Sequence, residues 1–230
     1  MIFHQLFEAE TSTYTYLLAD ELTREAILID TVLECVDRDF KLLKEMDLKL
    51  KYTVDTHVHA DHITGSGELK NRTGAKTCIS SHANVSCIDI ALNDGDQLHF
   101  GSYNLEAIET QGHTNSCMSF KIADMIFTGD VLLIRGTGRT DFQQGSPNKM
   151  FQSIREKIFI LPPSTKIYPG HDYKGFTFST VELEKKFNPR ISINKTSDDF
   201  HKTMSELKLA PPKKLNIAVP ANLKCGILSN

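Results

Sequence analysis

The sequence predicts an α+β fold, and three observations lead to this prediction. The chain opens with short runs rich in β-branched and aromatic residues, at 2–7, 13–19 and 25–30, which are typical of strands separated by polar turns. Apolar residues at helical spacing follow at 36–46 and lead into another strand-like run, LKYTV. Strand-like segments resume after residue 75, in a chain whose 230 residues suit a single domain.

The second half is predicted to mix short strands with helices. The strand-like segments are AKTCISS, DQLHFG, YNLEAIET, CMSFKI, DMIFTGD and TKIYPGH. Ser146 as N-cap and Pro147 at the first helical position predict a helix over 148–159, and STVE at 179–182 fits a capping box that opens another. A last helix is expected from about 198 to 207. We expect the residues from about 190 to 230 to form a short C-terminal extension that packs on the domain.

Composition and charge exclude several classes of partner. The net charge is −3 and basic residues form no run, so neither nucleic acid nor an anionic membrane surface is an expected partner. The longest apolar runs are short and interrupted, as by Asp130 in MIFTGDVLLI, so no membrane span is expected. The N-terminal residues lack the features of a secretory signal, and we therefore expect a cytoplasmic protein.

The cysteines are predicted to have no catalytic or cross-linking role. Their number is odd and no two form a CxxC pair, which argues against a zinc ribbon or a disulfide framework. A reducing compartment is the simplest interpretation, and each thiol is expected to be a small buried apolar side chain. The five residues are Cys35, Cys78, Cys87, Cys117 and Cys225.

The strongest functional signal is DTHVHADH, which places His57, His59, Asp61 and His62 within six residues. Imidazole nitrogens and carboxylate oxygens converge on transition metals, so a metal site is favoured over a histidine-rich turn. Residues two apart at the end of a strand face the same side, so His57 and His59 would project together. A turn leading into a short helix is expected to follow.

Three more pairs put a histidine or aspartate after a glycine at a strand end: Gly112-His113, Gly129-Asp130 and Gly170-His171. Each pair alone is equally typical of a turn. With HVHADH they complete the pattern H-x-H-x-D-H … H … D … H, which resembles the metallo-β-lactamase superfamily. The segments GTGRTDFQQGS, YPGHDYKGFTFSTVELEKKFNPR and AVPANLKCG resemble its persulfide dioxygenase branch, which is close to glyoxalase II. The resemblance implies an αββα sandwich with a metal site at the edge of its two sheets.

The resemblance also implies one ferrous iron, Fe²⁺, per chain, held by His57, His113 and Asp130. Two histidines and one carboxylate leave coordination positions open, an arrangement that suits oxygen chemistry at iron. The other motif residues would orient these ligands through hydrogen bonds and bound waters. They are His59, Asp61, His62 and His171.

The implied reaction is the oxidation of glutathione persulfide by O2 and water to sulfite and glutathione. Arg139, Tyr173 and Arg190 are expected to hold the anionic tripeptide, although a salt bridge or a core contact explains Tyr173 and Arg190 equally well. Dimers are common in this family, so the resemblance also allows a homodimer.

Two alternative functions stay open. One is a two-metal thioesterase like glyoxalase II, in which a metal-bound hydroxide attacks a glutathione thioester. The larger helical C-terminal domain that is usual in glyoxalase II has no counterpart in the roughly sixty residues after His171. The other alternative is a non-catalytic module for metal binding or sulfur transport, which would not need the full ligand set and an arginine-bearing loop.

Overall fold

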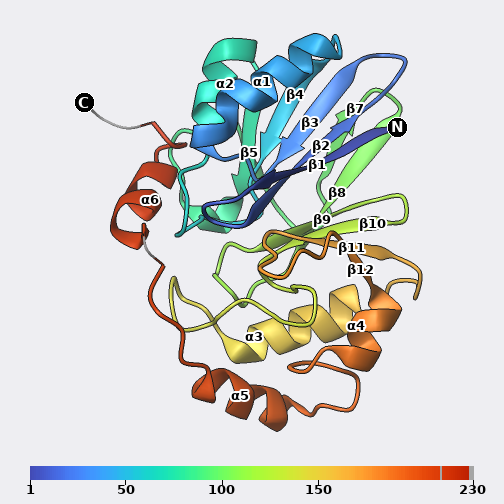
Figure 1. Ribbon diagram of the computed structural model, residues 1–230, viewed down its shortest axis with the longest axis vertical. Coiled ribbons are helices and arrows are strands. Elements are labelled where there is room, and N and C mark those ends of the chain that lie inside the picture. Colours follow the sequence, from blue (N-terminus) through green and yellow to red (C-terminus); the bar gives the residue numbers. More distant parts are fainter. Residues whose placement is uncertain (213, 228–230) are drawn as a thin grey trace.

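Two six-stranded sheets lie face to face at the centre of the computed structural model, which describes residues 1–212 and 214–227 (Figure 1). The first sheet has the order β1-β2-β3-β4-β5-β6, and its strands are β1 (Ile2–Glu8), β2 (Thr13–Ala19), β3 (Glu25–Ile29), β4 (Lys49–Val54), β5 (Lys76–Ser80) and β6 (Ile90–Leu92). The second has the order β12-β11-β10-β9-β8-β7, with β7 (Gln97–Phe100), β8 (Tyr103–Glu109), β9 (Met118–Ile122), β10 (Met125–Gly129), β11 (Lys166–Pro169) and β12 (Ser179–Thr180).

Both sheets are mixed. The strands β3, β4, β5 and β6 pair in parallel, as do β10 and β11, while the remaining neighbours are antiparallel. Every strand expected from the sequence is present. The strands β6 and β12 were not predicted, because two or three residues are too few for a hydrophobic period to register.

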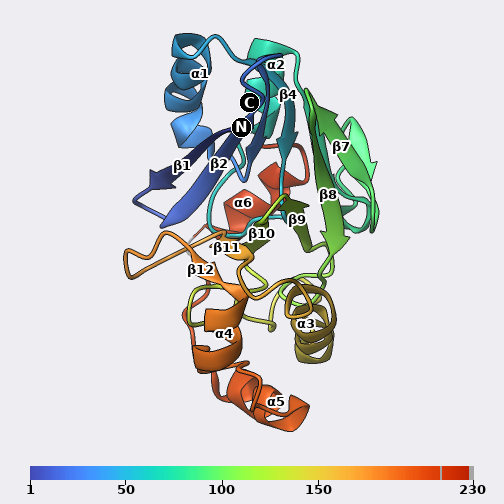
Figure 2. The ribbon, with the colours of Figure 1, turned by 90° about the vertical axis from the view of Figure 1, so that its right-hand side faces the viewer.

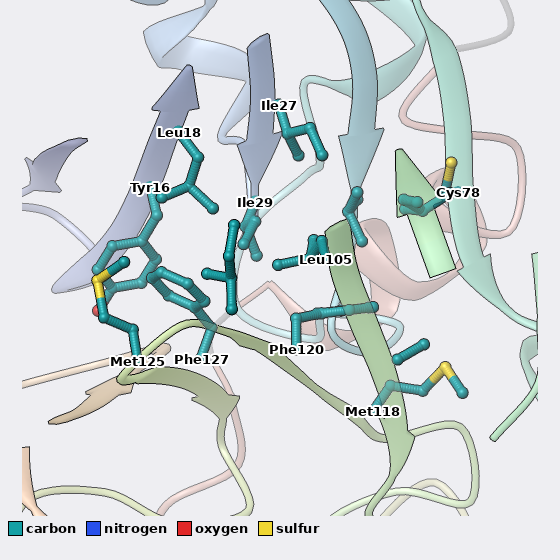
Figure 3. Close-up of a cluster of buried hydrophobic side chains, with 14 of the residues drawn as sticks. Tyr16, Leu18, Ile27, Ile29, Cys78, Leu105, Met118, Phe120, Met125 and Phe127 are labelled. Carbon is teal, nitrogen blue, oxygen red and sulfur yellow. The ribbon is translucent and has the colours of Figure 1, made fainter. Parts of the chain in front are cut away.

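The main core lies between the two sheets. Side chains alternate along a strand, so Tyr16 and Leu18 of β2 point toward the second sheet and meet Phe127 of β10 (Figure 3). The rings of Tyr16 and Phe127 are 4.8 Å apart between centroids, and both side chains are almost fully buried. Leu17, one residue along, points to the opposite face of its sheet and packs under a helix.

Helices cover the outer face of each sheet (Figure 2). On the first sheet these are α1 (Val36–Glu45) and α2 (Ser66–Thr73); on the second they are α3 (Pro147–Gln152), α4 (Val181–Phe187) and α5 (Ser197–Glu206). The predicted α+β fold, an αββα sandwich, is therefore confirmed. No helix in the described part of the chain is long and apolar enough to cross a membrane.

The helix ends refine the sequence predictions. The side chain of Ser146 caps α3 as expected, and the helix continues as a π-helical turn over Ser153–Ile158. The cap of α4 is Thr180 rather than Ser179, because the Thr180 hydroxyl accepts the Leu183 N–H at 3.2 Å. A further helix, α6 (Leu215–Asn222), lies in the tail and was not predicted.

One disulfide contradicts the prediction that no cysteines pair. Cys87, just before β6, is joined to Cys225, just after α6, across 138 residues of sequence. Sequence spacing could not reveal the pair, because only the packing of α6 brings the two residues together. Cys78 and Cys117 are free and buried as expected, and burial raises the pKa of Cys117 to about 12. Cysteine usage therefore gives no support for a reducing compartment.

Asp20 ties the two sheets together at the end of β2 that lies away from the loops described below. Its carboxylate accepts the backbone N–H groups of Leu22, Thr23 and Ser102, and also the Ser102 hydroxyl, at 2.7–3.1 Å. The hydrogen bonds from Ser102 hold the pKa of Asp20 well below its ordinary value. The carboxylate therefore stabilises the fold in its ionised form.

Replacing Asp20 by alanine should lower the thermal midpoint by a few degrees at neutral pH, because four donors lose their acceptor. A depressed folded pKa stabilises the native state above the unfolded value of about 3.9, and this contribution is lost as the pH falls through the folded pKa. The midpoints of wild type and Asp20→Ala should therefore converge under strongly acidic conditions. Calorimetry across pH measures this gap, and a gap independent of pH would contradict the role of the charge.

Candidate metal centre

The predicted site residues meet at one edge of the sandwich, where the loops after β4, β8, β10 and β11 lie together. The carboxyl ends of parallel strands emerge at the same edge of a sheet, which explains why these loops are neighbours. Backbone hydrogen bonds join them: the Met118 N–H donates to Thr56, and the Gly170 N–H donates to Gly129, each at 2.8 Å. The metal site therefore rests on both sheets.

His57, His113 and Asp130 form a triad with the geometry of a metal site. Each offers one ligand atom, and these atoms lie within 4.8 Å of one another. His113 donates from Nδ1 to the carbonyl of Arg139 at 2.7 Å, so Nε2 is its free acceptor nitrogen. Burial and the neighbouring histidines His59 and His113 hold the pKa of His57 well below its usual range, which keeps it neutral as a ligand must be.

Thr56 and Asp30 set the orientation of His57. The Thr56 hydroxyl donates to Asp30 Oδ2 at 2.9 Å, so its oxygen can accept the Nδ1–H of His57, which lies 3.0 Å away. The same carboxylate accepts the Thr56 backbone N–H at 2.7 Å. This arrangement leaves Nε2 of His57 for a metal, in the manner of a supported histidine ligand.

His171 lies between two carboxylates. Its Nδ1 is 2.6 Å from Asp130 Oδ1, and its Nε2 is 2.8 Å from Asp61 Oδ2 and 3.1 Å from the Thr13 hydroxyl. Burial lowers the pKa of His171, but the Asp130 and Asp61 carboxylates outweigh it and hold the pKa well above its usual value. Both ring nitrogens of His171 are therefore engaged as donors, and Oδ2 of Asp130 stays available for a metal.

His59 and His62 occupy the inner side of the same loop. His59 Nε2 lies 3.2 Å from Asp30; burial lowers the pKa of His59, but Asp30 raises it to about 9. His62 Nδ1 lies 3.0 Å from Asp61, and burial lowers the pKa of His62. Ligand atoms of these two histidines and Asp61 also lie within 4.8 Å of one another. Nδ1 of His59 and Nε2 of His62 are buried without a hydrogen-bond partner among the described residues.

A cavity of about 510 Å³ opens above the triad and is walled largely by the loops after β10 and β11. Leu209, Ala210 and Pro212 of the C-terminal extension form part of its wall. The three residues predicted to hold the substrate, Arg139, Tyr173 and Arg190, all line this cavity. The volume suits a ligand the size of a tripeptide.

The two arginines already have protein partners. The Arg139 guanidinium makes a bidentate salt bridge with Asp141, at 2.6 and 2.7 Å, and also donates to the carbonyl of Ala210 at 2.8 Å. Arg190 donates to the carbonyl of Thr137 at 2.5 Å. Tyr173 is 71 % exposed, and its ring stacks parallel to that of His171. Direct contact with substrate stays a prediction for all three.

Sequence reasoning missed several supporting residues. Thr13, Asp30 and Thr56 hold histidine rings, and Asn222 of α6 contacts the backbone of the histidine loop. Asp30 ends a buried strand, a position that could have marked it as a site residue. Nothing in the sequence marks Thr13 or Asn222, since their contacts depend on tertiary packing.

The sequence and the fold have counterparts in known proteins. The family model described as the metallo-beta-lactamase superfamily matches residues 9–171, and the chain therefore belongs to this superfamily. Over 229 residues it is 48% identical to the mitochondrial persulfide dioxygenase ETHE1 of Mus musculus and to that of Homo sapiens, covering 99% of this chain and 89% of each relative. The crystal structure of ETHE1 from Myxococcus xanthus matches with a TM-score of 0.96 and 48% identity, covering 99% of this chain and 100% of that chain. The predicted place of this chain in the persulfide dioxygenase branch is confirmed.

Asp130→Ala should abolish tight metal binding while leaving the sandwich folded. The carboxylate is the only charged member of the triad, and His171 would face an empty position in its absence. Metal content after purification, compared with that of His82→Ala on an exposed histidine, measures the effect. Full metal content in Asp130→Ala would show that Asp130 is not a ligand.

Proposed function

We propose that the protein is an iron-dependent dioxygenase that oxidises glutathione persulfide with O2. The observation that carries the proposal is the triad of His57, His113 and Asp130, in which two imidazole nitrogens and one carboxylate oxygen converge beneath an open cavity. Persulfide dioxygenases that are 48% identical over nearly the whole chain support the same activity. One iron per chain fits the donors that the site leaves free.

The reaction balances as glutathione persulfide plus O2 plus water giving glutathione, sulfite and two protons. The outer sulfur is oxidised and its bond to the inner sulfur breaks, while dioxygen is reduced. Bound ferrous iron would supply the open positions and the redox capacity that dioxygen chemistry needs. The protein residues have the separate task of holding the ligands and enclosing the substrate.

His171 is assigned to hold Asp130 ionised and oriented. The Asp130 and Asp61 carboxylates raise its pKa, which favours protons on both ring nitrogens, and these nitrogens lie 2.6 Å from Asp130 and 2.8 Å from Asp61. Asp61 in turn contacts His62, which extends the network along the histidine loop. The prediction that His59, Asp61, His62 and His171 support the ligands is consistent with these contacts.

The cavity wall suits an anionic peptide. Four cationic side chains lie around it: Arg135, Arg139, Lys174 and Arg190. Three of them are engaged with protein groups, and the Lys174 ammonium makes no hydrogen bond or salt bridge to other described residues. The carboxylates of glutathione would be attracted to this wall while the persulfide points toward the triad.

The thioesterase alternative receives less support. The relatives that match almost the entire chain at 48% identity carry the name persulfide dioxygenase. The dioxygenase proposal therefore takes precedence.

Turnover experiments test the proposal. Given glutathione persulfide, the iron-loaded protein should consume O2 and produce sulfite, and it should hydrolyse S-lactoylglutathione poorly. Protein purified without added metal should contain about one iron per chain. Fast thioester hydrolysis without oxygen uptake, together with two zinc ions per chain, would reverse the assignment.

Arg139→Ala should lower kcat/KM by about ten- to a hundredfold, because a hydrogen bond to a charged group contributes roughly 1.5–3 kcal/mol. Arg139→Lys keeps the charge but loses the planar fork, so it should recover only part of the loss. Kinetics and iron content are measured together.

Asp141→Ala serves as the matched control for Arg139. It removes the bidentate partner but leaves the guanidinium in the cavity. If Asp141→Ala reproduces the whole loss seen in Arg139→Ala, the arginine acts by shaping the loop, and the assignment to substrate binding is wrong.

A further inference from the structure

The end of α6 packs tightly against the histidine loop. Ala218 and Ala221 form a small apolar cluster with Ile63, and the Gly67 N–H donates to the carbonyl of Cys225 at 3.0 Å. A Cβ added to Gly226 would lie 2.0 Å from the carbonyl oxygen of Thr64, so a larger residue cannot take that place. Segments about 160 residues apart in sequence are therefore in close contact.

Asn222 makes three hydrogen bonds to the backbone of this loop. Its Oδ1 accepts the Thr64 N–H at 2.8 Å, and its Nδ2 donates to the carbonyls of His59 at 2.8 Å and His62 at 2.9 Å. The residue is only 5 % exposed, so water cannot replace these bonds without opening the contact. A carboxamide has two N–H donors and one carbonyl acceptor, and all of them are used here.

The three backbone groups bonded to Asn222 belong to His59, His62 and Thr64, so the segment that they fix contains Asp61 and His62. Asp61 is hydrogen-bonded to His171, and His171 to Asp130, so a shift of the loop reaches the triad through two hydrogen bonds. Partners of metal ligands typically change metal affinity or activity by about 10–100-fold when removed. The loop between His59 and Thr64 also begins only two residues after His57.

We propose that Asn222 is a positioning residue for the metal centre: its carboxamide fixes the backbone of residues 59–64 so that the ligands and their supports keep their geometry. The inference rests on the proposed function only in taking His57, His113 and Asp130 as the metal ligands. It does not depend on which substrate the metal serves.

The disulfide between Cys87 and Cys225 provides a separate anchor three residues further on. It holds the end of α6 to the segment before β6, whereas the Asn222 side chain holds the histidine loop itself. Cys87→Ser removes the cross-link and leaves the carboxamide in place. This variant therefore separates the effect of attaching α6 to the domain from the effect of the hydrogen bonds between Asn222 and the histidine loop.

Asn222→Asp is the central variant, because it keeps the size and one acceptor oxygen but replaces both N–H donors with carboxylate oxygen. The carbonyls of His59 and His62 would then face an acceptor. Cobalt(II) alone serves as the probe: its affinity and its visible absorption spectrum are measured on metal-free protein. We expect Asn222→Asp and Asn222→Ala to bind cobalt about 10–100-fold more weakly with an altered spectrum.

Activity gives a second measurement. With iron bound at saturating concentration, kcat should fall while KM changes little, because the cationic side chains of the cavity wall, Arg135, Arg139, Lys174 and Arg190, lie outside this loop. A wild-type protein that binds cobalt but consumes no O2 would overturn the proposed function and leave the cobalt comparison valid. The two proposals can therefore fail separately.

Asp20→Ala is the matched control, since it also removes hydrogen bonds that are partly buried, but it lies at the end of β2 away from the metal centre. It and Cys87→Ser should bind cobalt with wild-type affinity. If Asn222→Asp lowers the thermal midpoint yet keeps the affinity and spectrum of wild type, Asn222 is only structural and the proposal is wrong. Failure of both Asn222 variants to fold, when Asp20→Ala folds, would equally overturn a role specific to the metal centre.

Discussion

The imidazole of His171 is hydrogen-bonded to Asp61 and Asp130, whose carboxylates raise its pKa, and the candidate metal centre depends on this interaction. Two partly buried carboxylates would otherwise repel each other across the ring, so the raised pKa makes the ring a cation. The cation between them changes that repulsion into attraction, and it also joins loops that leave different sheets. A metal bound by Asp130 would therefore meet a carboxylate that is already charged and oriented.

Glycines allow the loops to approach each other this closely. A Cβ on Gly170 would lie 2.8 Å from Asp130 Oδ1, and one on Gly138 would lie 2.3 Å from the carbonyl oxygen of Asp130. Gly129 has a φ of +50°, a backbone conformation that favours glycine, and it also lies against Thr56, where a side chain has no room. Each glycine that precedes a histidine or aspartate of the motif is thus a packing requirement: Gly112 against Met150, Gly129 against Thr56 and Gly170 against Asp130.

Local sequence pattern predicted most of the elements because their signals are local. Tyr16 and Leu18 point to the core between the sheets, and Leu17 points to the core under the helices. Because both faces of the strand are buried, its sequence is a continuous apolar run, which is typical of a fully buried strand. The proximity of His57, His113 and Asp130 was expected from the resemblance to a known family, whose motif has these residues after strand ends in a fixed order. The layering of the two sheets came from the resemblance to a known family, since strand pairing over long distances leaves no local trace.

Contacts between distant segments account for what was missed. The pairing of Cys87 with Cys225 and the contacts of Asn222 depend on where the tail packs, and no spacing rule specifies that position. Arg139 shows a further limit of prediction from sequence. The sequence places it in the correct loop but does not show that its guanidinium already donates to both carboxylate oxygens of Asp141. The location of a charged residue is therefore easier to predict than its partner.

The long separation between the histidine loop and Asn222 also has a consequence for the order of events during synthesis. The loop and its supporting helix are about 160 residues apart, which corresponds to roughly 10–30 s of translation at typical elongation rates. Throughout that interval the histidines exist without the groups that hold their backbone. Asp130 and His171 also emerge before α6. On the positioning role proposed for Asn222, the candidate metal site therefore reaches its final geometry only after the tail has been translated.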